Sequence, residues 1–366
     1  MSRTNRGEVF AADEIAVVHV MNRVVRRCFL MGDDPVSGKN FDHRKLWIED
    51  EIARSAANFG IDLIAFSLLS NHMHLILRSR PDVVATWDDT EVARRWLMLC
   101  PKRKDELGRA KEPAVPELNS IRLDADKTAE IRRRLSDISW WMRLLCQRIA
   151  QRANREDGAE GRFWQSRFRG VRLIDEEAIL AAAAYVDLNP IRAALAETLE
   201  DSDFTSVQRR VQSLVLEDDC ATVSPLPDSP DIAVNAPTES KSRPDSCLSP
   251  VSIDELRDAL GPQPSVSQYR CSDKGFASMT TADYLQLLDW TARQIVGGQR
   301  SSTPSDTPPM FARLRIKPEV WCELVTNFGI LFSLVAGQPH RVDQFRSRRR
   351  GSRFHLRATT RELLTA

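Results

Sequence analysis

Three stretches of the chain carry the alternating or β-branched apolar pattern that is typical of β-strands. They span residues 15–25 (IAVVHVMNRVV), 61–69 (IDLIAFSLL) and 72–78 (HMHLILR). Only Ser70 and Asn71 separate the second stretch from the third, and this tight connection predicts a β-hairpin. A further strand or hairpin is predicted within residues 162–174.

Between these strands, apolar residues recur at spacings of three and four, which is the period of a helix. The predicted helices cover residues 41–58, 89–99 and 124–155, and another begins after Asp175, whose side chain can cap it. Single helices alternate with strand pairs rather than with single strands. We therefore expect an α+β fold with a mainly antiparallel sheet flanked by helices.

The periodic pattern ends near residue 216. Residues 216–268 are rich in proline and serine, which predicts a disordered acidic linker. Aromatic and helical patterns return in residues 269–366, so we expect a small, mostly helical C-terminal region with a basic tail. The predicted organisation is a domain at 1–215, the linker, and this C-terminal region, whose function the sequence does not indicate.

Composition narrows the functional classes. The chain has 366 residues, of which 42% are hydrophobic and 28% charged, as in an ordinary globular protein. No apolar run reaches the ~20 residues of a membrane span, and the first residues lack an apolar signal core. We therefore expect a cytoplasmic protein with no membrane partner. Seven cysteines without a C-x-x-C pair argue against a disulfide framework and against a thiolate zinc site.

The net charge of +1 hides a segregation of charge. Residues 217–258 hold ten Asp or Glu and three Lys or Arg, a balance of −7, so the rest of the chain carries +8. Arginines cluster at 132–134 and 346–350, which is typical of solvated surface. In residues 161–172 (GRFWQSRFRGVR) they are interleaved with Phe and Trp. That pattern suits phosphate pairing and base stacking, and it predicts contact with nucleic acid.

Two of the six histidines, His72 and His74, lie one residue apart at the start of a predicted strand. Side chains alternate along a strand, so both imidazoles share a face and form half of a metal site. A cupin is excluded because residues 75–81 (LILRSRP) contain no acid. An amidohydrolase barrel is excluded because the histidines left downstream lie in the basic tail. We expect His19, on the first strand, to be a core residue rather than a metal ligand.

A second concentration of reactive groups is the segment 183–195, AAYVDLNPIRAAL. Tyr185 is the only one of the three tyrosines before the acidic segment. Asn189 follows four residues later, so on a continuous helix the two side chains would share a face. Pro190 also makes Asn189 a suitable N-cap for a new helix. Metal ligation and helix capping both stay open for Asn189, and simple packing stays open for Tyr185.

The motifs SNHMHLIL, GRFWQSRF and AAYVDLNPIRAAL, in this order and spacing, resemble those of the single-tyrosine HUH transposases of small bacterial insertion sequences. The closest branch is that of the REP-associated tyrosine transposases. The segment 17–27 (VVHVMNRVVRR) is similar to the opening strand of that family. The resemblance covers roughly residues 15–210 and implies a ferredoxin-like HUH domain. The chain departs from the family pattern at Ser70, where proline is usual, in the longer segment 80–125, and in everything beyond residue 216.

The resemblance also implies a mechanism. Tyr185 matches the nucleophile that forms a 5′-phosphotyrosine intermediate, and His72, His74 and Asn189 match the ligands of a Mg²⁺ or Mn²⁺ ion. The substrate would be single-stranded or hairpin DNA from repeat sequences, which is cleaved and rejoined. No nucleotide cofactor is expected, because the covalent intermediate conserves the energy of the phosphodiester bond.

The residues expected to contact DNA lie at the end of the first strand and in the GRFWQSRF segment. They are Asn22, Arg23, Arg162, Trp164, Gln165, Arg167 and Arg169. Packing in the core is an equal alternative for Trp164. Two other functions stay open, a host-retained DNA-binding protein that recognises repeat hairpins without mobilisation and an unrelated metal-dependent hydrolase. The sequence does not decide between a monomer and a homodimer.

Overall fold

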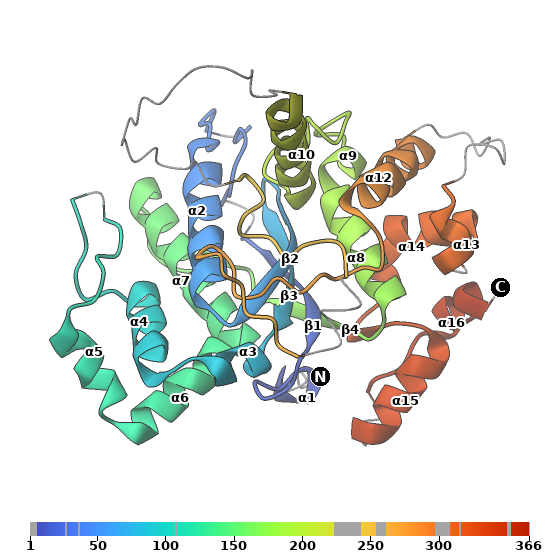
Figure 1. Cartoon of the computed structure of the whole chain (residues 1–366). Coiled ribbons are helices and arrows are strands. Elements are labelled where there is room, and N and C mark those ends of the chain that lie inside the picture. The colour runs from blue at the N-terminus through green and yellow to red at the C-terminus, as the bar shows by residue number, and fades with distance from the viewer. Residues whose placement is uncertain are drawn as a thin grey trace, which may run out of the picture.

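A computed structural model gives the structure of the chain. It describes residues 6–25, 28–35, 37–106, 108–222, 243–253, 261–296, 308–314, 316–349 and 353–365. In this part of the chain, helices cover both faces of a five-stranded sheet (Figure 1). The predicted α+β class is confirmed at this level.

The sheet has the strand order β2-β3-β1-β4-β5. Its strands are β1 (Val17–Arg23), β2 (Ile61–Leu68), β3 (His72–Ser79), β4 (Arg169–Leu173) and β5 (Val335–Ala336). Neighbouring strands are antiparallel except β4 and β5, which are parallel. The first three strands are the predicted ones, and β2 and β3 form the predicted hairpin. The strand predicted within 162–174 is shorter than expected and begins only at β4.

One face of the sheet is covered by α2 (His43–Asn58) and α7 (Ile138–Asp157), beside a group of helices at the lower left of Figure 1. That group is α3 (Pro81–Thr86), α4 (Asp89–Leu99), α5 (Val115–Arg122) and α6 (Ala125–Leu135). The prediction of a single helix over 124–155 is wrong, because the helix is interrupted between α6 and α7. The Asp137 carboxylate accepts a hydrogen bond from the Ser139 backbone N–H at 2.7 Å and starts a new helix there.

The opposite face carries α8 (Glu176–Asp187), which packs directly on β2 and β3. Around α8 lie helices from later parts of the chain (Figure 1). They are α9 (Asn189–Arg192), α10 (Ser206–Thr222), α12 (Thr281–Val296), α13 (Met310–Leu314), α14 (Pro318–Leu331), α15 (Pro339–Arg349) and α16 (Ala358–Thr365). A short helix, α1 (Arg6–Val9), precedes β1. None of the helices described here combines the length and apolar character that crossing a bilayer requires.

The C-terminal region is part of the same body as the first 215 residues, contrary to the predicted division into separate regions. β5 extends the sheet, because the Arg172 N–H donates to the Leu334 carbonyl at 2.9 Å and the Ile174 N–H to the Ala336 carbonyl at 3.0 Å. α14 packs against α8. A boundary near residue 215 would therefore cut through the core.

Part of the predicted linker also packs on the sheet. Leu248 and Val251 are each 2% exposed, and the Ser249 N–H donates to the Leu63 carbonyl at 2.8 Å. The prediction of a disordered linker is thus wrong for residues 243–253. Other parts of it, residues 223–242 and 254–260, lie outside the described residues.

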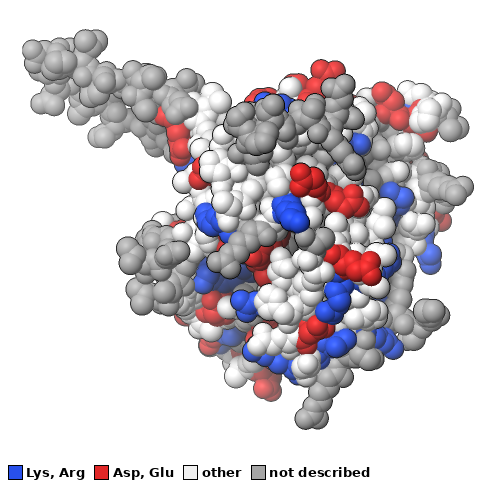
Figure 2. All heavy atoms as spheres, turned by 90° about the vertical axis from the view of Figure 1, so that its right-hand side faces the viewer, with Lys and Arg blue, Asp and Glu red and all other residues white. Residues whose placement is uncertain are grey.

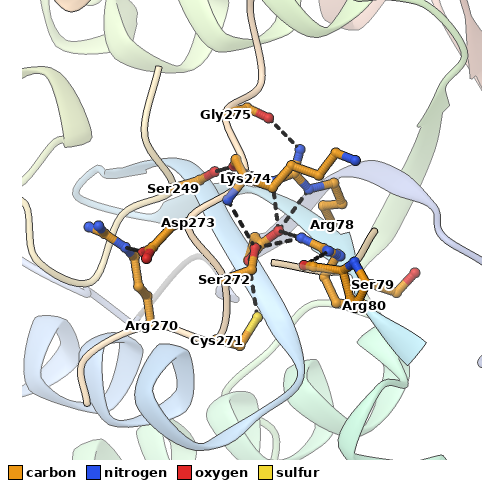
Figure 3. Close-up of polar contacts among 12 residues, drawn as sticks. Arg78, Ser79, Arg80, Ser249, Arg270, Cys271, Ser272, Asp273, Lys274 and Gly275 are labelled. Atoms are coloured by element: carbon orange, nitrogen blue, oxygen red, sulfur yellow. Dashed lines mark hydrogen bonds and ion pairs between the residues drawn. The ribbon is translucent and has the colours of Figure 1, made fainter. Parts of the chain in front are cut away.

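A buried ionic cluster joins residues 271–275 to the sheet (Figure 3). The Asp62 carboxylate accepts hydrogen bonds from Arg78 Nε at 2.7 Å, Arg80 Nη1 at 3.2 Å and Ser272 Oγ at 2.7 Å. Arg78 Nη1 also donates to the Gly275 carbonyl at 2.7 Å. Burial alone would raise the pKa of Asp62, but the two guanidinium charges lower it below its usual value. The cluster therefore fixes the later segment to β2 and β3 through charge.

Candidate functional site

His72 and His74 lie at the start of β3 and face α8. Their ring centroids are 5.0 Å apart, His74 is 1% exposed and His72 is half-buried. Met73 and Leu75, which alternate with them, are fully buried on the other face of the strand. The predicted placement of both imidazoles on one face is confirmed.

Each imidazole is held through its Nδ1 atom. His72 Nδ1 lies 2.7 Å from Asn71 Oδ1, and His74 Nδ1 lies 2.9 Å from Nε2 of His19. An amide oxygen only accepts, so His72 Nδ1 carries the proton and its Nε2 keeps a lone pair. If His74 donates from Nδ1 in the same way, its Nε2 also keeps a lone pair. That Nε2 is buried with no hydrogen-bond partner. Metal-binding histidines are typically held in this manner.

His19 is a member of the site that the sequence did not reveal. Its burial was predicted and is confirmed at 5% exposure. However, its ring stacks on that of His74, with centroids 5.1 Å apart and an interplanar angle of 13°. The contact depends on the register of β1 and β3, which places His19 opposite Ile76 on the same face as His74. The strand pattern gives the face of His19 but not this register.

All three histidines are neutral at physiological pH. Burial lowers the pKa of His19 to about 3 and that of His72 to about 4, with smaller contributions from the positive charges of Arg169 and Arg23 respectively. Burial also lowers the pKa of His74 well below its usual value. Neutral imidazoles have the lone pairs that a bound cation requires.

Tyr185 is brought to the histidines by α8. That helix begins where the Asp175 carboxylate accepts a hydrogen bond from the Ala178 N–H at 3.0 Å. The Tyr185 ring is half-buried, with its centroid 5.5 Å from that of His74 and 5.7 Å from that of His19, both in edge-on contacts. The structure therefore brings Tyr185 and the histidine pair together from separate elements.

Asn189 is the first residue of α9 and is 7% exposed. The N-cap position of α9 is Leu188, and no side chain caps it, so the capping alternative for Asn189 is wrong. The Asn189 amide nitrogen is buried without a hydrogen-bond partner. Since the two ends of an amide are interchangeable by rotation, this position also suits a metal-binding oxygen. Its role as third ligand stays a prediction.

The side chains of His72, His74 and Asn189 are of the kinds that bind divalent cations. Among the described residues, no group of three or more His, Cys, Asp or Glu side chains could hold a metal ion. A cation here would therefore rely on the two imidazoles and the amide of Asn189. The buried, unsatisfied atoms of His74 and Asn189 are what such a site needs.

A cavity of about 480 Å³ opens beside Tyr185. It is lined by polar and basic side chains from β1, the loop before β4, the start of β4 and α9, together with Thr326, Asn327, Gly329 and Ile330 of α14. The basic ones are Arg23, Arg167, Arg169 and Arg192. The guanidinium of Arg192 lies 4.5 Å from the Tyr185 ring centroid. Arg192 lies in the motif AAYVDLNPIRAAL, but the sequence alone did not single it out.

A larger cavity of about 960 Å³ lies next to the first, on the side of α7. Gln165 and Arg167 line both cavities. Arg162 and Trp164 line only the larger one, opposite Arg143 of α7. The predicted DNA-contact residues thus gather along two adjoining cavities rather than on an open surface.

Five of the seven predicted DNA-contact residues are exposed, and two are held internally. Asn22 is 4% exposed and its Nδ2 lies 3.2 Å from Cys146 Sγ. Trp164 is half-buried and donates from its indole to the Cys146 carbonyl at 2.8 Å. Both line the larger cavity, but the polar atom of Asn22 binds β1 to α7 and that of Trp164 binds the loop before β4 to α7. Trp164 therefore both packs against α7 and lines the larger cavity.

Several arginines of the two clusters outside this region form ion pairs. Arg133 and Arg134 both pair with Glu130. Near the C-terminus, Arg346 pairs with Asp343 and Arg349 with Glu14. Figure 2 shows basic and acidic side chains interspersed on the face that carries the C-terminal helices. This matches the expected behaviour of solvated surface.

No protein-family model and no curated protein matches the chain. Among solved structures, the chain is similar to a REP-associated tyrosine transposase bound to a REP hairpin. The two are 14% identical, the match covers 64% of this chain and 96% of the other, and the TM-score is 0.34. So distant a likeness carries no argument about activity, and the function proposed below rests on the arrangement of His72, His74 and Tyr185.

Proposed function

We propose that the protein is a metal-dependent DNA strand transferase that cleaves and rejoins single-stranded or hairpin DNA through Tyr185. The observation that carries the proposal is the edge-on contact of Tyr185 with His74, whose Nε2 is buried and unpaired, at the mouth of an arginine-lined cavity. The first four strands follow the order β-α-β-β-α-β, with five helices (α3 to α7) in the second helical connection, and their sheet order is 2-3-1-4. That order supports the ferredoxin-like HUH fold that the sequence motifs imply.

His72, His74 and Asn189 are the residues that would hold Mg²⁺ or Mn²⁺. When bound, such an ion polarises the scissile phosphate and stabilises negative charge in the transition state. The protein's part is to present neutral donors from a rigid strand. Asn71 and His19 hold the two imidazoles in place through their Nδ1 atoms.

Tyr185 would attack phosphorus with its phenol oxygen. A bond forms between that oxygen and phosphorus, the bond from phosphorus to the 3′ oxygen breaks, and the phenol proton passes through water to the departing 3′ oxygen. The products are a 5′-phosphotyrosine and a free 3′-OH. The positive charge of Arg192 over the ring stabilises negative charge on the phenol as it develops. Attack by a 3′-OH reverses the step and rejoins DNA without a nucleotide cofactor.

The DNA strand would follow the two cavities. Arg23, Arg167 and Arg169 suit its phosphates beside Tyr185, and Arg162 suits a phosphate further along. Gln165 lies between the cavities and can read a base edge. An unpaired strand suits cavities of this size, because successive bases can turn away from one another.

The test is a covalent adduct. Full-length protein is incubated with Mn²⁺ and a pool of labelled single-stranded hairpin oligonucleotides, and the mixture is separated on a denaturing protein gel. The labelled adduct should disappear in Tyr185→Phe and persist in the matched control Tyr269→Phe. Binding of hairpins without any adduct would favour the DNA-binding alternative. Cleavage without an adduct would favour a hydrolase that uses water.

A further inference from the structure

The C-terminal helix α14 crosses directly over the Tyr185 ring. Phe328 is fully buried, with its ring centroid 5.6 Å from that of Tyr185 and 5.7 Å from that of His19. The nucleophile and the histidine cluster thus share one aromatic neighbour. This neighbour comes from the part of the chain that has no counterpart in the family the motifs resemble.

α14 is distorted at this crossing. Asn327 has φ −112° and ψ 17°, outside helical values, and interrupts the helix one residue before Phe328. The Thr326 carbonyl accepts a hydrogen bond from Arg192, whose guanidinium also lies over the Tyr185 ring. Arg192 therefore joins the interruption in α14 to the nucleophile.

Gly329 lies close to the phenol oxygen of Tyr185. A Cβ atom placed on Gly329 would lie 3.2 Å from Tyr185 Oη and 3.8 Å from Cζ. The φ angle of Gly329 is not among the positive ones, so its backbone conformation does not require glycine. Glycine inside a helix is unfavourable relative to alanine. A methyl group here would require the phenol oxygen to move by a few tenths of an ångström.

We propose that α14 forms one side of the nucleophile's cleft, in which Phe328 and Gly329 are positioning residues. Phe328 holds the Tyr185 ring against the histidines, and Gly329 leaves the clearance that the phenol oxygen occupies. The substrate phosphate then has to approach Tyr185 from the side of Arg23, Arg167 and Arg169. The inference rests on the proposed function of Tyr185 as nucleophile.

The activity test uses full-length Gly329→Ala, with Cys322→Ala, on the same helix and away from Tyr185, as the control. The added methyl group should displace the phenol and lower the initial rate of adduct formation on the order of 10- to 100-fold, because small misplacements of a reacting group have large effects. Affinity for Mn²⁺ should stay unchanged. Phe328→Leu should also slow the adduct without weakening DNA binding. An unchanged or faster rate in Gly329→Ala would overturn the proposal, a faster one indicating that α14 obstructs the cleft.

A thermodynamic cycle tests the contact independently of activity. Gly329→Ala should raise the thermal unfolding midpoint more in a Tyr185→Phe background than in the wild type, because the phenol oxygen that the methyl group meets is then absent. Equal shifts of the unfolding midpoint in both backgrounds would show that a side chain at position 329 does not contact the phenol oxygen. If the wild type forms no adduct, the proposed function fails, while this cycle still decides whether α14 positions Tyr185.

Discussion

His19 Nε2 lies 2.9 Å from His74 Nδ1, and the two buried rings are stacked. Because His19 engages Nδ1 of His74, Nε2 is the nitrogen of the His74 ring that is left to bind a cation. Residues that hold a metal ligand in this way usually affect metal affinity strongly when replaced. The most direct predictions concern this pair.

His19→Leu should weaken Mn²⁺ binding by about 10- to 100-fold, because His74 loses the partner that fixes its ring. His19→Gln should retain much of the affinity, since its amide oxygen can accept from His74 Nδ1. Isothermal titration of the full-length protein without DNA measures both. Wild-type affinity in His19→Leu would show that the contact is only packing.

Chelation with EDTA should abolish cleavage of hairpin DNA, and added Mg²⁺ or Mn²⁺ should restore it. His72→Ala should behave like the chelated protein, because the half-buried imidazole supplies one of the proposed donors. His340→Ala, at an exposed position on α15, is the matched control and should cleave normally. Full cleavage in EDTA would show that the histidine pair does not act by binding a metal ion.

The stability of the metal-free protein should decrease as the pH falls below about 6.5. The pKa of His19 is about 3 in the folded chain and near 6.5 when unfolded, so in this range the unfolded chain binds a proton that the folded chain excludes. The contribution of His19 to stability is therefore fully present above about pH 6.5, and it is lost progressively as the pH falls toward about 3.

Urea unfolding in EDTA at about pH 7.5 and about pH 5 measures this loss. His19→Gln lacks the titrating group, so its stability should fall less between the two pH values. His340→Gln removes an exposed imidazole and should follow the wild type. Parallel curves for wild type and His19→Gln would contradict the assigned burial.

Asp62→Asn should destabilise the protein by about 3–5 kcal/mol, the usual cost of removing one partner of a buried ion pair. The substitution leaves Arg78 and Arg80 buried beside a neutral amide. Glu130→Gln removes the shared partner of two arginines at the surface and should change stability little. Denaturant unfolding of both variants checks the difference, and equal effects would indicate that water reaches the Asp62 cluster.

Local pattern was enough to predict the strands, the hairpin and the face shared by His72 and His74, because alternation depends only on neighbouring residues. It also drew attention to Tyr185, whose role as nucleophile is implied by the family resemblance and stays a prediction. The break between α6 and α7 was missed because the apolar period continues across Asp137, and the cap appears only when its side chain turns back on the backbone.

The remaining features depend on contacts between distant segments. His19 meets His74 only through strand register, which periodicity does not fix. Phe328 and Gly329 contact Tyr185 although the acidic segment lies between them in the sequence. The composition of that segment predicted a linker between separate regions. The Asp62 cluster likewise pairs a strand residue with Ser272. Charge and close packing bring these segments together, and neither leaves a local trace in the sequence.

The crossing of α14 over Tyr185 has a consequence for the order of events during synthesis. Ribosomes add roughly 5–20 residues per second, so the chain between Tyr185 and Gly329 takes on the order of ten seconds to make. Throughout that interval α8 can fold on the sheet, but Phe328 and Gly329 have not yet emerged. A nascent chain therefore carries the tyrosine without its complete surroundings, and a ribosome that stalls before α14 releases a product in which this residue is not held in place.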